Sequence, residues 1–193
     1  MRILAAGAEC FNTRGYAHTT MTRIARKAGV STGTVYAYFS DKDDVLRHIM
    51  RDHLENVMAP GESWAASIPP DAEFRAAMMS LLRGSHAQQE ELAGLHRVFH
   101  ERIEKDEAFS AIADEFRARA LEVGRRIVER FGGPRARRDV TASARVIIAV
   151  LEFCSHVNVI HSNNVHFEDV ARVAIDMIDA YFTSPVTRRD DTE

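Results

Sequence analysis

Hydrophobic residues recur along the chain at the three- and four-residue spacing of an α-helix, and the alternation typical of a β-strand is nearly absent. The first apolar stripe, within residues 1–14, is formed by Ile3, Leu4, Ala8 and Phe11. Similar stripes predict further helices over residues 21–28, 32–39, 40–58, 71–86, 90–105, 107–131, 139–163 and 166–183. We therefore expect an all-α protein with about nine helices.

Segments rich in helix-breaking residues divide this series. Residues 59–71, APGESWAASIPPD, are predicted to be a linker because Pro, Gly and Ser interrupt helices. We expect Trp64 to pin that linker against a helix or to fill a pocket entrance. The polar end of the chain, SPVTRRDDTE, is predicted to be disordered. The expected organisation is a head over residues 1–48, a helical body over 49–183 and a tail over 184–193.

Residues 19–42, TTMTRIARKAGVSTGTVYAYFSDK, predict two short helices joined by a tight turn. The first would end at Gly29, since glycine readily takes the left-handed conformation of a helix end. Ser31 can cap the second, whose Val35 and Phe39 would face the core. The rest of that second helix is small, hydroxyl-bearing and aromatic, with no acid, so it can approach DNA closely. This is a helix-turn-helix pattern, with its second helix as the candidate reader of DNA.

At these positions the chain resembles the DNA-binding region of the TetR family of bacterial transcriptional regulators. The resemblance covers roughly the first quarter of the chain and is only one of helical layout beyond it. The matching residues are Phe11, Gly15, Tyr16, Thr19, Thr20, Ile24, Ala25, Ala28, Gly29, Val30, Ser31, Gly33, Tyr36, Phe39, Lys42 and Leu46.

The resemblance implies that the third helix of the head lies in the major groove. Thr32, Gly33, Thr34 and Tyr36 would then lie nearest the bases, with Tyr38 and Lys42 at phosphates. Independently, the start of the second helix offers free N–H groups that suit a phosphate. The candidate DNA-binding residues are Thr20, Thr22, Arg23, Ser31, Thr32, Gly33, Thr34, Tyr36, Tyr38 and Lys42.

Charge is distributed unevenly along the chain. The net charge of −3 does not by itself favour nucleic-acid binding. Residues 1–48, however, contain seven Lys and Arg against four Asp and Glu, a net charge of +3, which leaves −6 for the remaining residues. A basic head on an acidic body suits a protein that touches DNA with one end.

The sequence gives no sign of export or of a cofactor. Cys10 and Cys154 lie in apolar helical patterns and are expected to be buried free thiols in a reducing compartment, not a disulfide or zinc framework. No apolar run is long enough for a membrane span, and the start of the chain lacks a signal-peptide pattern. We expect a cytoplasmic protein without a cofactor or bound metal.

The last two helices, 139–163 and 166–183, carry broader apolar surfaces than a monomer of this size needs to bury. The TetR resemblance implies a homodimer in which these helices form a four-helix interface. The alternative is that both are ordinary core helices. The expected interface residues are Val150, Val157, Ala171, Ala174, Ile178 and Tyr181.

Methionine, phenylalanine and a few histidines are predicted at the centre of the body. Methionine adapts to varied shapes, so such a lining is compatible with a cavity for a small, mainly apolar effector. A filled core is the alternative. The candidate ligand-binding residues are Met78, Phe99, His100, Phe116, Phe153 and His156.

Other classes of function were weighed on the histidines of the body. His96 and His100 have metal-ligand spacing, but Glu101 does not share their face. No HExxH, GxSxG, phosphate-loop or CxxC motif occurs. The sequence favours a repressor that binds double-stranded operator DNA and is released by an effector, and not an enzyme. The alternatives are a regulator that is constitutive or gated by a partner protein, and a helical metal-binding protein or enzyme.

Overall fold

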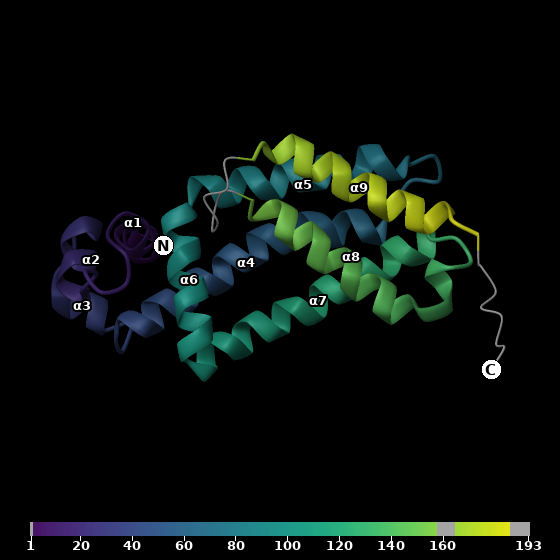
Figure 1. The fold of residues 1–193 in the computed structure, drawn as a ribbon. Helices are drawn as coiled ribbons and strands as arrows, with labels where there is room; N and C mark the ends of the chain where they lie inside the picture. Colours follow the sequence, from purple (N-terminus) through teal and green to yellow (C-terminus); the bar gives the residue numbers. More distant parts are fainter. Residues whose placement is uncertain (1, 158–164, 186–193) are drawn as a thin grey trace.

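The computed structural model describes residues 2–157 and 165–185 (Figure 1). Within these ranges the chain forms nine α-helices and one short 3-10 helix, η1 (Ala136–Asp139), and no strand. The all-α prediction is confirmed. The α-helices are α1 (Arg2–Arg14), α2 (Met21–Ala28), α3 (Thr32–Tyr36), α4 (Lys42–Ala66), α5 (Phe74–Glu91), α6 (Ala93–Lys105), α7 (Glu107–Phe131), α8 (Val140–Ser155) and α9 (Phe167–Thr183).

The linker predicted over residues 59–71 is wrong for its first half, because α4 continues through Pro60 to Ala66. A proline removes one helical hydrogen bond, so local sequence predicts a break there. Contacts on both sides of the proline hold the helix together instead. The Arg119 guanidinium of α7 binds the carboxylates of Glu55 and Glu62. The Trp64 ring stacks on Phe131 of α7 with centroids 6.3 Å apart, so Trp64 pins the end of α4 to a helix.

Two other predicted helices are shorter than expected. α3 ends at Tyr36, and the chain turns before Phe39, which is only half buried. α8 ends at Ser155. The continuation predicted for residues 158–163, and the predicted disorder of residues 186–193, lie outside the described residues.

The head is built from α1, α2 and α3 and lies at one end of an elongated molecule (Figure 1). Gly29 ends α2 with a φ of 67°, a left-handed conformation that suits glycine. Thr20 caps α2 by accepting a hydrogen bond from the Arg23 N–H, and Ser31 caps α3 by accepting one from Thr34. These caps fix the angle between α2 and α3 and thereby the direction of the outer face of α3.

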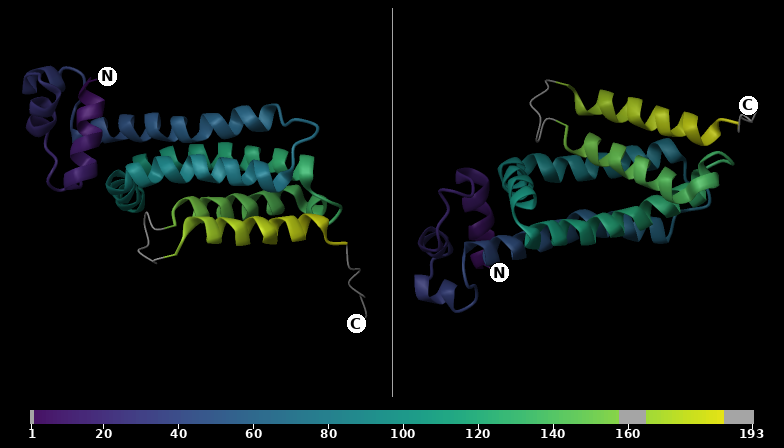
Figure 2. Two further views of the ribbon diagram at one scale, coloured as in Figure 1. Left: turned by 90° about the horizontal axis from the view of Figure 1, so that it is seen from above. Right: turned by 60° about the horizontal axis from the view of Figure 1, so that its bottom comes forward.

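Two hydrophobic clusters fill the molecule, and the first crosses the predicted domain boundary near residue 48. The first joins Phe11, Ile24 and Leu46 of the head region to Phe99 and Phe116 of α6 and α7. The second lies farther along the body between α5, the end of α7, α8 and α9. Figure 2 shows α4 running from the head into the body, with α9 at the outer edge beside α5 and α8. Head and body therefore share the first of these clusters.

Candidate nucleic-acid interface

The outward face of α3 is exposed and carries no acidic residue. The side chains of Tyr36 and Tyr38 are 56% and 73% exposed, which is unusual for large rings in a free protein. Gly33 is also exposed, and a Cβ there would meet only the Ser31 Oγ, at 3.8 Å. Internal packing therefore does not require glycine at this position. Close approach of a partner to the backbone would explain it, since glycine in a helix costs about 1 kcal/mol relative to alanine.

Two hydroxyl groups predicted to contact DNA, those of Ser31 and Thr34, already hydrogen-bond to each other in the free protein. The Ser31 Oγ lies 2.8 Å from the Thr34 Oγ1, and both residues take part in the cap of α3. Ser31 is exposed, whereas Thr32 and Thr34 are half buried. A hydroxyl can donate one hydrogen bond and accept two, so both oxygens keep capacity for DNA.

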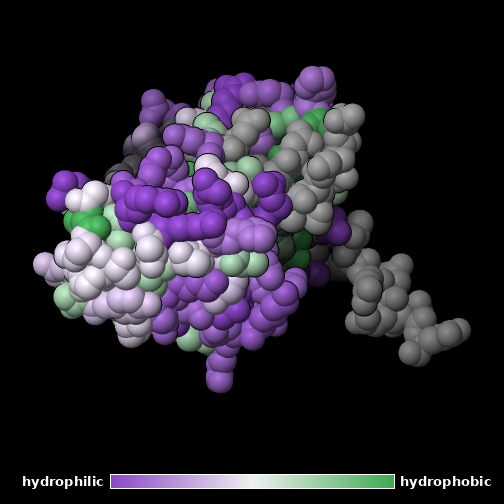
Figure 3. Space-filling model, turned by 90° about the vertical axis from the view of Figure 1, so that its left-hand side faces the viewer, coloured by the Kyte–Doolittle hydropathy of each residue, from purple (hydrophilic) through white to green (hydrophobic). Residues whose placement is uncertain are grey.

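The start of α2 lies beside α3 and presents Thr20 and Thr22 as exposed side chains. The Arg23 guanidinium donates a hydrogen bond to the carbonyl of His18 at 2.8 Å, which orients it along the edge of the head. Figure 3 views this end of the molecule, where a pale surface of intermediate hydropathy adjoins a strongly hydrophilic one. Small polar groups for base edges and cations for phosphates thus occur on one end of the protein.

Lys42 is more enclosed than a purely surface cation. Its ammonium donates to the carbonyls of Tyr16 and Thr19, at 3.0 and 3.4 Å, and lies 3.9 Å from the centroid of the Tyr16 ring. An ammonium has three donors. A phosphate contact from Lys42 would use the third.

Two polar joints connect the head to α6. The side-chain carbonyl of Asn12 in α1 accepts a hydrogen bond from the Leu95 N–H at 2.9 Å, so the head caps the start of α6. The backbones approach closely here, because a Cβ on Gly94 would lie 1.9 Å from the Asn12 carbonyl oxygen. At the other end of α6, the Arg102 guanidinium lies 4.6 Å from the centroid of the Tyr16 ring.

The second joint also contains a carboxylate of α4. Asp43 accepts a hydrogen bond from the Tyr16 hydroxyl at 2.6 Å and lies 3.5 Å from Arg102. Burial raises the pKa of Tyr16 to about 12, and the hydrogen bond to Asp43 adds to this effect. Tyr16 therefore stays protonated and can hold the joint closed. No local pattern points to the roles of Asn12 and Arg102 in these joints, because Leu95, Tyr16 and Asp43 are distant from them along the chain.

Most of the residues predicted for a dimer interface face the core of their own chain, where a second chain cannot reach them. Ala171, Ala174 and Ile178 are buried in the core of the same chain, and Val157 is buried too. Val150 and Tyr181 are half buried and pack against that core. α9 is apolar on adjoining faces, and the sequence prediction assigns the inner of these faces to the interface. The exposed apolar side chains of these two helices are Val146, Phe153, Val173 and Met177, hereafter the outer face.

The six predicted ligand-binding residues do not form one cluster. Met78 belongs to the far core cluster, whereas Phe99 and Phe116 belong to the cluster shared with the head. Phe153 is 54% exposed on the outer face, because α8 is apolar on more than one side. His100 and His156 do meet, with ring centroids 5.5 Å apart. The prediction of one cavity lined by all six is therefore wrong.

A cluster of four histidines lies where α4, α6 and the end of α8 meet. The ring centroids of His53 and His96 are 4.6 Å apart, and His156 lies 5.5 Å from both His96 and His100. The Nε2 atoms of His53 and His96 are buried without a hydrogen-bond partner. Burial lowers the pKa of His53 to about 4 and that of His96 to about 3. Both rings are thus neutral at physiological pH.

Several other predictions can be compared with the structure. Cys10 and Cys154 are confirmed as buried free thiols, and burial raises the pKa of each. Among the described residues, no group of three or more His, Cys, Asp or Glu is arranged to hold a metal ion. No helix in that part of the chain is long and apolar enough to cross a membrane.

Residues 3–49 match the sequence profile of the bacterial regulatory proteins of the tetR family. Curated relatives match over the same region. The HTH-type transcriptional regulator HbdR of Aromatoleum sp. (strain CIB) is 44% identical over 54 residues, which are 28% of this chain and 24% of that protein. The fatty acid metabolism regulator protein of Bacillus subtilis (strain 168) is 35% identical over 54 residues, 28% of each chain. The matches thus span about a quarter of these relatives' lengths.

Solved structures extend the likeness to the body. A protein from Mesorhizobium loti MAFF303099, described as a TetR-family transcriptional regulator, has a TM-score of 0.72 at 22% identity. The alignment covers 93% of both chains. At this identity the likeness shows the fold alone, and the head supplies the sequence relationship. Residues 3–49 thus carry the sequence of a tetR-family head, and the chain shares the fold of this TetR-family regulator over 93% of its length.

Proposed function

We propose that this protein is a dimeric, DNA-binding transcriptional regulator in which α3 reads the operator. The observation that carries the proposal is the outward, acid-free face of α3, with Tyr36 at its end and Tyr38 just beyond it both more than half exposed, in a head of tetR-family sequence. We retain the ten candidate DNA-binding residues as the contact set. Tyr36 and Gly33 are placed toward bases, and Tyr38, Lys42 and Arg23 toward phosphates.

The proposed partner of the outer face is a second copy of the chain. Val146, Phe153, Val173 and Met177 lie on two neighbouring helices and leave large apolar side chains in water. Pairing two such faces would bury them in a four-helix contact. A two-fold dimer would present two copies of α3 to successive major grooves, about 34–36 Å apart.

We further propose that a small effector releases this regulator from its operator. α4 is one 25-residue helix that carries Leu46 of the shared core near one end and Trp64 near the other. α6 is joined to the head through Asn12 and Arg102. Displacement of α6 or α4 in the body would therefore move the head. A ligand that prefers the displaced form lowers DNA affinity by at most its differential affinity for the two forms.

The histidine cluster is the proposed site for the polar end of the effector. His53 and His96 bring two buried nitrogens without partners, and an unsatisfied buried polar group is costly. Phe99 lies beside both rings, with centroids 5.8 and 6.1 Å away, and offers an apolar surface. A ligand with a polar head and an aromatic or aliphatic body would suit this corner. Because α4 and α6 both contribute, binding there would act on the elements connected to the head.

The DNA proposal is tested by selecting fragments from random duplex DNA with the full chain and sequencing them. We expect enrichment of a near-palindromic site whose halves lie one helical turn apart. Retention of DNA without any enriched sequence would contradict a reading role for α3.

The effector proposal is tested by screening compounds for their ability to release the protein from that site. If compounds never release it and His96→Leu changes nothing, the constitutive or partner-gated alternative is favoured.

A further inference from the structure

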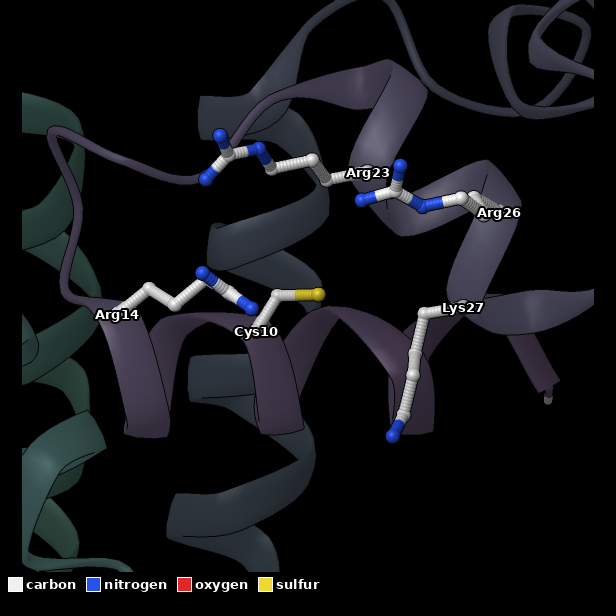
Figure 4. Close-up of a pocket in the computed structure, with 5 residues that line it drawn as sticks. All are labelled: Cys10, Arg14, Arg23, Arg26 and Lys27. Atoms are coloured by element: carbon white, nitrogen blue, oxygen red, sulfur yellow. The ribbon is translucent and has the colours of Figure 1, made fainter.

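A basic hollow lies on the head between α1 and α2. Its volume is about 270 Å³, and it is lined by Cys10, Arg14, Arg23, Arg26 and Lys27 (Figure 4). Arg14 runs along α1 toward Cys10, while Arg23 and Arg26 lie across from it on the side of α2. Four of the five lining residues are thus cations drawn from two helices.

The cations of this hollow are poorly neutralised by the protein itself. Lys27 pairs with Glu9 at 2.5 Å, and its side chain points away from the arginines. Arg14, Arg23 and Arg26 form no ion pair with any carboxylate of the described residues. Three guanidinium groups without a counter-charge repel one another, and a bound anion would relieve that repulsion.

Cys10 does not supply the missing negative charge. Burial raises the pKa of its thiol above the ordinary value, although the nearby cations act in the opposite direction. The sulfur is therefore a neutral thiol at physiological pH. The floor of the hollow is uncharged and its rim is cationic, which is an arrangement that favours a ligand carrying negative charge at its surface.

The hollow adjoins the proposed reading surface. Arg26 is four residues after Thr22 on α2, so both side chains lie on the same side of that helix. α2 in turn packs against α3. A duplex that places its bases against α3 has a backbone beside α2, and guanidinium groups bind phosphate through paired hydrogen bonds.

We propose that Arg14, Arg23 and Arg26 form a phosphate-binding site that receives the DNA backbone next to the bases contacted by α3. The inference rests on the proposed DNA-binding function and extends the contact set by Arg14 and Arg26. Such a site contributes affinity for any sequence and positions α3 without choosing the bases. It also makes binding more dependent on salt, because each neutralised phosphate releases counterions.

The test uses the full chain with Arg14→Gln and Arg26→Gln combined. Binding to the selected operator and to an unrelated duplex of equal length is measured across a salt series. The logarithmic salt slope should fall by about 0.9 for each lost contact, so by about 1.8 for the pair. Operator and unrelated duplex should lose affinity by the same factor. The lysine pair Arg14→Lys and Arg26→Lys keeps the charge and should preserve most of the slope.

A matched control removes two cations of the body, through Arg117→Gln and Arg126→Gln on α7. These arginines pair with Asp114 and Glu122 on their own helix. Their loss should leave the salt slope unchanged. Thermal unfolding followed by circular dichroism checks that each variant keeps its fold.

Three outcomes would overturn the inference. One is an unchanged slope in the glutamine pair while the operator is still bound, which leaves the proposed function intact. Another is a loss confined to the operator, which would make these arginines readers of bases. A third is tight binding of inorganic phosphate that the glutamine pair abolishes without any change in DNA binding, since the hollow would then serve a small anion. Failure of the wild-type chain to select any sequence would instead refute the proposed function.

Discussion

The arginines of the head and those of the body are held in different ways. In the body, Arg83 pairs with Glu168, and Arg119 binds Glu55 and Glu62 together. Such pairs satisfy the charge within the chain and connect one helix to another. In the head, Arg14 and Arg26 have no such partners in the described part of the chain. These body arginines are neutralised within the chain, whereas Arg14 and Arg26 of the head leave positive charge for a partner. This difference supports the proposed contact of the head with DNA, independently of the helix-turn-helix pattern.

The largest expected effect comes from a charge on the outer face of the body. Met177→Asp should give folded monomers with greatly weakened operator binding, because an unpaired charge buried in the dimer costs several kcal/mol. Light scattering and an operator titration measure both effects. Ala174→Asp is the matched contrast on the same helix: this residue lies in the core, so the variant should unfold. A folded Met177→Asp dimer of unchanged operator affinity would reject the outer face as the interface.

Acid should weaken the region where head and body meet. Burial depresses the pKa of His53 to about 4 and that of His96 to about 3, against an ordinary value of 6.5. The unfolded chain therefore binds more protons than the folded chain below pH 6.5. The free energy of unfolding should be highest above pH 6.5. It should fall as the pH drops toward 4, by up to about 1.4 kcal/mol per pH unit for each ring.

Denaturant titrations between pH 7.5 and 4.5 measure this slope. His96→Gln should flatten it, while His18→Gln, an exposed histidine outside the cluster, should not. Charges near the cluster modulate the effect: burial, followed by His156, lowers the pKa of His100, while Glu152 and Glu104 oppose this shift and Arg117 adds to it. An identical slope in His96→Gln and the wild type would exclude the cluster as the acid-sensitive element.

The close contact between Asn12 of α1 and Gly94 of α6 allows a test of how the body constrains the head. Gly94→Ala would place a methyl group 1.9 Å from the Asn12 carbonyl oxygen, so α1 or α6 must shift. We expect a loss of about 1–3 kcal/mol in the free energy of unfolding, as for other overpacked positions, together with weaker operator binding. Gly84→Ala in α5 is the control, since a Cβ there meets nothing within 4 Å. That change should stabilise the protein by up to about 1 kcal/mol.

The two variants are compared by chemical denaturation and by operator titration. If Gly94→Ala unfolds like Gly84→Ala and binds DNA like the wild type, the close approach of α1 to α6 does not constrain the head.

The sequence predicted the head better than the body because the head carries local signals. The bounds of α2 follow from the Thr20 cap and from Gly29, which lie next to the helix that they end. The course of α4 through Pro60 depends on Arg119 and Phe131, which are distant in sequence, so local breakers gave the wrong answer.

The faces of α8 and α9 could not be assigned for a related reason. Periodicity identifies the buried face of a helix only when the opposite face is polar. Here Met177 and Ile178 are consecutive apolar residues, but Met177 is exposed and Ile178 is buried. The residues of the candidate site likewise fall into those that local sequence signals reveal and those that they do not. Exposed residues of α3 were found from caps and spacing, whereas Asn12, Gly94 and Arg102 act through contacts that no local pattern encodes.

The smallest expected effect distinguishes two tyrosines of the head. We propose that Tyr36 faces a base edge and Tyr38 the DNA backbone, so their alanine variants should differ in kind. Tyr36→Ala should weaken operator binding by about 1 kcal/mol, the low end for a base contact because one hydroxyl makes a single hydrogen bond, and should leave binding to unrelated DNA unchanged. Tyr38→Ala should weaken both by the same factor. Competition titrations with operator and unrelated duplexes measure the two ratios. Neither side chain is buried, so both variants should unfold at nearly the wild-type temperature. If Tyr36→Ala lowers affinity for both duplexes alike, Tyr36 does not read a base. The base-facing side of α3 would then be the side that carries Gly33.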